Sequence, residues 1–417
     1  MKKFILFISA ISMLATVGCK NDEDTNEVKK TPPTPNKGTV TNTAATNETS
    51  PEPLPDDGKA NGYTTVTPET RYVITPNVGG PNEPNQVYVD LSTKETFVVK
   101  RDAWDLAFYC GNDDFRVILN ASLAMTVKPT DNDKLETFIQ KDEKNMIVGK
   151  DNTNLNMPIA NHYIDEPSGL FIGNGTKGTG TAIAQIAERD QDNKIYLLNM
   201  GYTVSEVEPK VGGVNTLGDH RGWKKFKIVR HEQGYKITYA DHNVSRPDDF
   251  KTIIVKKDPA YNFVFLNLST GNYVRVQPKK KNWDLCFTTY TSWRTADRKQ
   301  ASNPANGIAF FPDIVTVNIH GGTRNTFFKY TDKEERDLRY PKYNKEKALR
   351  VNFNDEKYNN QMYFGRLWRD PINDKLRDDL IFVVKDNNEN YFKIKMLGYK
   401  NDEGKRGYPS FEYELLK

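Results

Sequence analysis

The residues of this chain that could perform chemistry are few and widely spaced. Five histidines occur in 417 residues, and no two of them show the spacing of paired metal ligands such as H-x-x-x-H. The chain has no C-x-x-C pair, no nucleophile elbow and no phosphate-binding loop of the usual pattern. Because no nucleophile, base or metal constellation emerges, we expect a binding function and no enzymatic activity.

Two residues are nevertheless possible ligands of a metal. His320 lies in the sequence NIHGGT, where small residues would let a flat molecule approach the backbone, and a neutral imidazole suits many transition metals. Met362 lies in a segment without regular periodicity, where a thioether can either pack or bind a soft metal. The alternative interpretation is that His320 ends a strand at a Gly-Gly turn and that Met362 fills a loop.

The elements that would position these residues follow from a repeat. The segment NQVYVDLSTKETFVVKRDAWDLAFY at 85–109 resembles NFVFLNLSTGNYVRVQPKKKNWDLCFT at 262–288. Each has an alternating apolar run, a Leu-Ser-Thr turn, a second run and Trp-Asp-Leu-x-Phe, which is typical of a β-hairpin followed by a strand. Further matches follow in the same order, at offsets that change by loop-sized steps. The pattern predicts a tandem duplication.

We therefore predict an all-β protein with mainly antiparallel sheets, few short helices and two similar β domains in tandem, at residues 63–242 and 243–417. Helical periodicity is weak, and Asn and Gly recur too often for long helices. If the duplication joins two complete domains, 243–417 should fold when it is expressed alone. Strands are predicted at 86–90, 96–99, 104–109, 182–188, 194–200, 224–229, 262–267, 273–277, 283–288, 380–385, 391–396 and 410–415.

The Trp-Asp-Leu segments predict core packing in both repeats. Alternation places the Trp, Leu and Phe on one face, so Trp104 and Trp283 are expected in the core. The Asp of each segment then points to the other face, where it could hydrogen-bond a neighbouring loop. Cys110 and Cys286 do not occupy equivalent places and are interpreted as packing residues, although a disulfide between them is left open.

The first residues indicate export and a lipid anchor. Residues 1–18 contain two lysines and a short apolar run, and Cys19 follows directly, as in a bacterial lipoprotein signal peptide. The alternative is a plain secretory signal with an incidental Cys. Residues 19–62 are rich in Thr, Asn, Pro and acidic residues and are predicted to form a disordered polar tether. The acidic NDED after Cys19 resembles the signal that sends some lipoproteins to the cell surface. A net charge of +4 gives no electrostatic case for nucleic acid.

The Trp-Asp-Leu-x-Phe segments, the hairpin at 380–396 and the ending RGYPSFEYELL give the chain a family resemblance. It resembles the HmuY family of haem-binding lipoproteins from the surface of Gram-negative anaerobes. The match covers most of 243–417 and is looser over 63–242. The resemblance implies a lipid-anchored haemophore of the outer membrane, facing the cell exterior, that takes haem or porphyrin and passes it to a TonB-dependent receptor.

The resemblance also implies haem ligands from two loops, one in mid-domain and one shortly before the last hairpin. His320 and Met362 are the first candidates, although 368–379 contains neither His nor Met. In the first repeat, Met157 and His162 are the nearby candidates. The alternative is a surface binding module without haem, which recognises a glycan, a peptide or a partner protein through the aromatic loops of 289–372.

Overall fold

The computed structural model describes residues 66–417 except 112–113, 142, 150–160, 172–179, 294–307 and 372. Antiparallel strands dominate these residues, which confirms the predicted all-β class. Helices in this part of the chain are short: α1 (Glu143–Met146), α2 (Lys333–Arg339) and α3 (Lys345–Ala348). The predicted signal peptide and tether lie outside the described residues.

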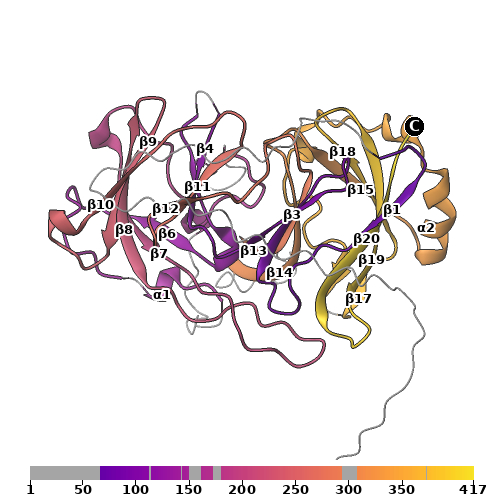
Figure 1. Ribbon diagram of the computed structural model, residues 1–417, viewed down its shortest axis with the longest axis horizontal. Coiled ribbons are helices and arrows are strands. Elements are labelled where there is room, and N and C mark those ends of the chain that lie inside the picture. The colour runs from indigo at the N-terminus through magenta and orange to yellow at the C-terminus, as the bar shows by residue number, and fades with distance from the viewer. Residues whose placement is uncertain are drawn as a thin grey trace, which may run out of the picture. The chain divides into compact units, whose positions relative to one another are not determined.

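Four antiparallel sheets carry the fold (Figure 1). Their strand orders are β10-β9-β8-β7-β6, β1-β20-β19-β18-β15, β12-β11-β4-β5 and β14-β13-β2-β3. The first ten strands are β1 (Arg71–Ile74), β2 (Asn85–Val89), β3 (Thr96–Lys100), β4 (Leu106–Tyr109), β5 (Val117–Leu119), β6 (Thr126–Pro129), β7 (Ile195–Asn199), β8 (Trp223–His231), β9 (Gly234–Asp241) and β10 (Lys251–Val255). The others are β11 (Phe263–Asn267), β12 (Asn272–Val274), β13 (Leu285–Trp293), β14 (Ile308–Val317), β15 (Arg324–Lys329), β18 (Leu380–Lys385), β19 (Tyr391–Lys400) and β20 (Arg406–Leu415), with a separate pair β16 (Arg369–Asp370) and β17 (Lys375–Leu376).

The two repeats exchange their first strands. β2 pairs with β13 of the second repeat, with Val87 opposite Phe287, and β1 pairs with β20, so the indigo β1 lies beside the yellow β20 in Figure 1. In return β11 of the second repeat pairs with β4 of the first, with Leu266 opposite Leu106. The repeated hairpins β2-β3 and β11-β12 are thus each built into the sheets of the other repeat.

The exchange produces two bodies, one built from a single continuous stretch of the chain and one from two separate stretches. We call residues 104–277, with β4 to β12, the continuous body, and residues 66–103 with 278–417 the composite body. One buried cluster takes all its buried members from Leu106–Tyr273. A second takes its buried members from Val66–Val98 and Leu285–Leu415. The repeat boundary at 242/243 therefore runs through the continuous body, between the paired strands β9 and β10.

Each exchanged hairpin is held by the aspartate of the other repeat's Trp-Asp-Leu segment. Asp105 Oδ2 accepts a hydrogen bond from the Leu268 backbone amide at 2.7 Å, and Asp284 Oδ2 accepts one from the Leu91 amide at 2.9 Å. Leu91 and Leu268 are the leucines of the two Leu-Ser-Thr turns. The expected contact of each Asp with a neighbouring loop is confirmed, and the loop belongs to the other repeat.

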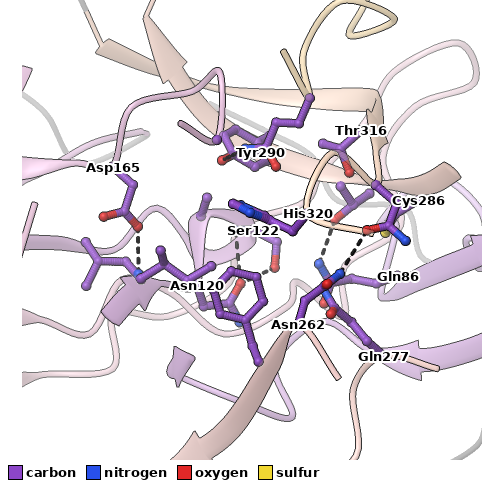
Figure 2. A pocket seen from close by; sticks show the side chains of 18 of the residues that line it. Gln86, Asn120, Ser122, Asp165, Asn262, Gln277, Cys286, Tyr290, Thr316 and His320 are labelled. Carbon is purple, nitrogen blue, oxygen red and sulfur yellow. Dashed lines mark hydrogen bonds between the residues drawn. The ribbon is translucent and has the colours of Figure 1, made fainter. Parts of the chain in front are cut away.

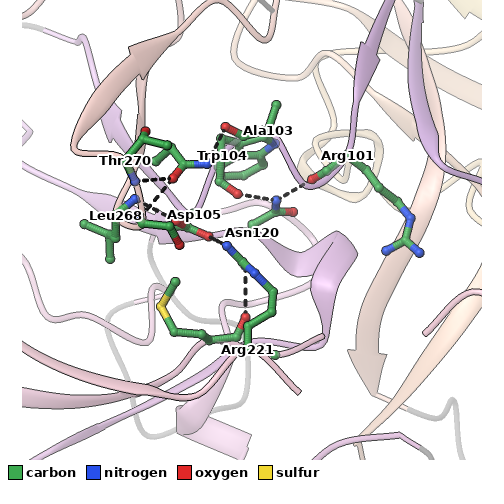
Figure 3. Close-up of polar contacts among 12 residues, drawn as sticks. Arg101, Ala103, Trp104, Asp105, Asn120, Arg221, Leu268 and Thr270 are labelled. Carbon is green, nitrogen blue, oxygen red and sulfur yellow. Dashed lines mark hydrogen bonds and ion pairs between the residues drawn. The ribbon is translucent and has the colours of Figure 1, made fainter. Parts of the chain in front are cut away.

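Asparagine side chains form hydrogen bonds with the backbone of the same two segments. Asn120 Nδ2 donates to the carbonyls of Arg101 and Trp104 at 2.7 and 2.8 Å (Figure 3). Asn318 Nδ2 makes the equivalent bonds to Lys280 and Trp283, both at 2.8 Å. An amide that satisfies two buried carbonyls fixes the backbone where each hairpin leaves its own repeat.

In the continuous body an ion pair between Arg221 and Asp105 adds to the contact of this aspartate with the Leu-Ser-Thr turn; we call each such aspartate–turn contact a clamp. Arg221 Nη2 lies 2.7 Å from Asp105 Oδ1 (Figure 3), and the Asp105 side chain is fully buried. In the second repeat the corresponding Asp284 accepts from the Thr323 hydroxyl at 3.0 Å instead. The two clamps are therefore alike in geometry but differ in charge.

Most predicted strands match the structure, with one clear exception. No strand occupies 182–188. Its amides have scattered acceptors: Ala184 N donates to Tyr196 Oη, Ala187 N to Asn193 Oδ1 and Ile186 N to the Phe115 carbonyl. The apolar residues there pack into the core of the continuous body without pairing. The hairpin predicted at 380–396 is formed by β18 and β19.

Cys110 and Cys286 are free and buried. They belong to different clusters, Cys110 to the core of the continuous body and Cys286 to an aromatic cluster shared by both repeats. Burial raises the pKa of both thiols to about 12. No helix among the described residues is long and apolar enough to cross a membrane.

Candidate functional site

The two repeated tryptophans pack against the exchanged hairpins. Trp104 meets Phe265 edge-on, with ring centroids 4.9 Å apart, and Trp283 meets Tyr88 in the same way at 5.0 Å. Both tryptophans are buried, as predicted. They do not share a face with the Leu and Phe that follow, since Leu106 lies in a different cluster from Trp104. The Trp precedes the strand, so strand alternation does not apply to it.

A cavity of about 90 Å³ lies where the two Trp–aromatic pairs meet. Residues of both repeats line it, and the close-up shows them converging on His320 (Figure 2). In that view Asp165 lies on one side of His320, while Gln86 and Gln277 lie on the other. The aromatic walls include Tyr88, Trp104, Phe263, Phe265, Trp283 and Tyr290.

The cavity is not symmetric, because equivalent hairpin positions carry different residues. Trp104 Nε1 donates to Gln86 Oε1 at 2.9 Å, and Gln86 Nε2 donates to Thr288. The repeat alignment that pairs Leu91 with Leu268 places Phe263 opposite Gln86. Phe263 offers no acceptor, and Trp283 Nε1 is buried without a partner. The second tryptophan of the cavity wall therefore has an indole N–H without an acceptor.

Two carboxyl groups, those of Asp165 and Glu166, also line the cavity. Asp165 accepts from the backbone amides of Leu119 and Ala182 at 2.7 and 2.9 Å, and burial raises its pKa to about 7. Glu166 is 7% exposed, its Oε2 has no partner, and burial raises its pKa. The described lining residues include no lysine or arginine, so the cavity favours neutral or cationic molecules.

His320 lies in the cavity wall among aromatic rings. Its imidazole stacks on Phe171 at 4.6 Å and meets Tyr109 and Phe263, each at 5.4 Å. Burial lowers its pKa to about 4, because an apolar surrounding disfavours the charged form. At neutral pH the imidazole is therefore uncharged, which is the form that binds a metal.

The other candidate ligands are not brought to His320. Met362 does not line the cavity, although its neighbour Gln361 does. His162 is exposed and also lies outside the lining, and Met157 falls outside the described residues. Cys19, the predicted lipidation site, is likewise not described. No group of three or more His, Cys, Asp or Glu among the described residues could hold a metal ion.

Sequence reasoning missed most of the cavity. Gln86, Gln277 and Glu166 carry no motif, and their meeting depends on the exchange of hairpins. The one available signal was the mismatch between Gln86 and Phe263 at equivalent positions of otherwise similar hairpins. The long segment 289–372 contributes Tyr290, His320 and Gln361 to the cavity lining, but Tyr290 lies in strand β13 and not in a loop.

The described residues form an all-β fold with an aromatic, partly polar interior cavity. The model of the HmuY protein family matches residues 82–235 and again residues 260–413. These matches cover more than half of the chain, so the chain belongs to the HmuY family and carries its domain as a tandem duplication. HmuY proteins are binding proteins, and membership suggests a haem-binding surface protein. No curated protein and no solved structure matches the chain.

Proposed function

We propose that this protein is a lipid-anchored surface protein that captures a small molecule in the cavity between its exchanged hairpins. The observation that carries the proposal is a set of three buried polar atoms without partners in the lining: Glu166 Oε2, Gln277 Oε1 and Trp283 Nε1. An unsatisfied buried polar group costs about 1–3 kcal/mol. A molecule that pairs with these atoms would offset that cost, which supports binding at this place.

Haem is the ligand that the family suggests, and the described residues do not fit it. A cavity of about 90 Å³ is well below the roughly 300–1,000 Å³ of typical small-molecule sites. His320 is the one histidine of the described lining, and no methionine accompanies it. The acidic carboxylates of haem would find Asp165 and Glu166 here and no cation. The geometry therefore favours the alternative without haem.

Haem capture stays the second candidate because of a neighbouring cavity. It measures about 280 Å³ and shares Phe263, Phe265 and Gln277 with the first. Phe263 lines both cavities and contacts the His320 ring, and the cations of the second cavity include Lys256 and Arg275. In this function His320 and Met362 remain the proposed ligands, and the protein would pass haem or porphyrin to a TonB-dependent receptor.

A haemin titration followed in the Soret region decides between the two candidates. Capture of a small molecule without haem predicts the broad band of free haemin. Haem capture predicts a sharp band, because axial side chains replace water on the iron.

The surface location is proposed from the signal peptide and Cys19. If Cys19 carries the lipid, Cys19→Ser should move the protein from the membrane fraction to the soluble fraction or leave it unprocessed. Fractionation followed by immunoblotting measures this. Normal processing and unchanged membrane association of the variant would rule out lipidation at this residue.

A further inference from the structure

We propose that the cavity between the exchanged hairpins recognises a small organic cation of the quaternary ammonium type. The inference rests on the proposed function, because it assumes that this cavity is the ligand site. It deepens that function by naming the chemical class of the molecule that the cavity holds.

The charge of the lining residues is the first reason to expect a cationic ligand. Asp165 and Glu166 line the cavity, and no lysine or arginine of the described lining opposes them. Both oxygens of Asp165 accept backbone amides. Glu166 accepts hydrogen bonds from Ser168 but leaves Oε2 buried and unpartnered. A buried carboxylate without a counter-charge is costly, and a cationic ligand would supply the missing charge.

Aromatic lining is the second reason. Trp104 and Trp283 are both 5% exposed and line the cavity with further aromatic side chains. A cation near aromatic rings is attracted by their quadrupoles, by about 0.5–1 kcal/mol at exposed sites and about 2 kcal/mol or more when it is desolvated. Recognition of quaternary ammonium groups by aromatic side chains is the best-known use of this attraction.

Size is the third reason. A cavity of about 150 Å³ holds benzene, with its six heavy atoms. By proportion, the 90 Å³ here gives room for about four heavy atoms, the size of a trimethylammonium group without the chain attached to it. Gln277 lies on the side of His320 away from Asp165. Its Oε1 has no hydrogen-bond partner and could accept a hydrogen bond from a hydroxyl attached to such a group.

Binding of a permanently charged cation should strengthen as the pH rises. Protonation at low pH removes the attracting charge, and the pKa of Asp165, raised by burial to about 7, puts the change near neutrality. We therefore expect affinity to fall by on the order of tenfold, or about 1.4 kcal/mol, from pH 8 to pH 5.5. Glu166, whose pKa burial also raises, loses its charge in the same direction as the pH falls. Burial keeps His320, Tyr290, Cys286 and Tyr88 neutral over this range because it lowers the pKa of His320 and raises that of the other three.

The test compares choline with 3,3-dimethylbutan-1-ol, which has the same shape but carries carbon in place of the charged nitrogen. Isothermal titration calorimetry of the full mature chain should show choline binding and at least tenfold weaker binding of the alcohol. Glu166→Gln keeps the side-chain shape and should weaken choline about tenfold without affecting the alcohol. Glu188→Gln is the matched control, because Glu188 is an exposed carboxylate outside the lining and its loss should change nothing.

Each outcome bears on the inference. Equal affinity for choline and the alcohol would overturn the charge preference while leaving the cavity as the ligand site. Unchanged choline affinity in Glu166→Gln, or no choline binding by the wild-type chain, would overturn the inference as well. A failure of the proposed function looks different, because haemin would then give a sharp Soret band.

Discussion

Residues 104–277 expressed alone should fold into a stable monomer, whereas residues 243–417 should not. The first fragment contains β4 to β12, hence two complete sheets, and all buried members of one core cluster lie within it. The second fragment begins after β9 and lacks β1 to β3, so strands β13 and β20 each lose one of their two partner strands. This reverses the expectation that the sequence repeat alone supports.

The expected loss for 243–417 is large. The missing hairpin contributes buried Val87, Val89, Leu91 and Val98 to the core, and each such side chain stabilises by about 1.5–3 kcal/mol. Their sum is comparable with the roughly 5–15 kcal/mol of a typical domain. The fragment could recover these contacts by exchanging hairpins with a second copy, so size-exclusion chromatography with light scattering must accompany circular dichroism. A monomeric 243–417 that unfolds cooperatively would refute the exchange.

Asp105→Ala should destabilise the protein by about 3–5 kcal/mol, the usual effect of removing one partner of a buried ion pair. The substitution leaves Arg221 without its counter-ion and the Leu268 amide without its acceptor. Urea unfolding measures the change. Asp105→Asn should lower the free energy of unfolding by less, because an amide oxygen can still accept the hydrogen bond from the Leu268 amide.

Asp241→Ala is the control for this prediction. Asp241 pairs with Lys224 at 2.8 Å, but its side chain is 62% exposed, and exposed pairs contribute about 0–1 kcal/mol. If Asp105→Ala cost no more than this control, the Trp-Asp-Leu aspartate would not be the clamp of the exchanged hairpin.

The sequence predicted the strands and the duplication because these depend on local alternation and on similarity between segments. Alternation around β2, β3, β11 and β12 is clear and matches the observed hairpins. It does not say which strand a hairpin pairs with, since β4 and β13 share the same Trp-Asp-Leu-x-Phe pattern. Partner choice is set by long-range contacts such as that of Asp284 with Leu91.

The cavity was less predictable from the sequence, because it also depends on long-range contacts. His320 could be singled out by type, and the structure places it in the cavity wall. Its aromatic surroundings come from Phe171 and Phe263, which no motif connects with it. Glu166 and Trp283 became candidates only because Glu166 Oε2 and Trp283 Nε1 are buried without a hydrogen-bond partner, a property of packing and not of residue order.

Haemin titration of the protein, followed in the Soret region, tests most directly whether the cavity serves a ligand other than haem. With one imidazole and about 90 Å³ in the described cavity, the wild-type chain should leave haemin with its broad band, and a His320→Ala, Met362→Ala double variant should behave identically. A sharp Soret band in the wild-type chain that is lost in the double variant would contradict this result and identify the protein as a haem carrier.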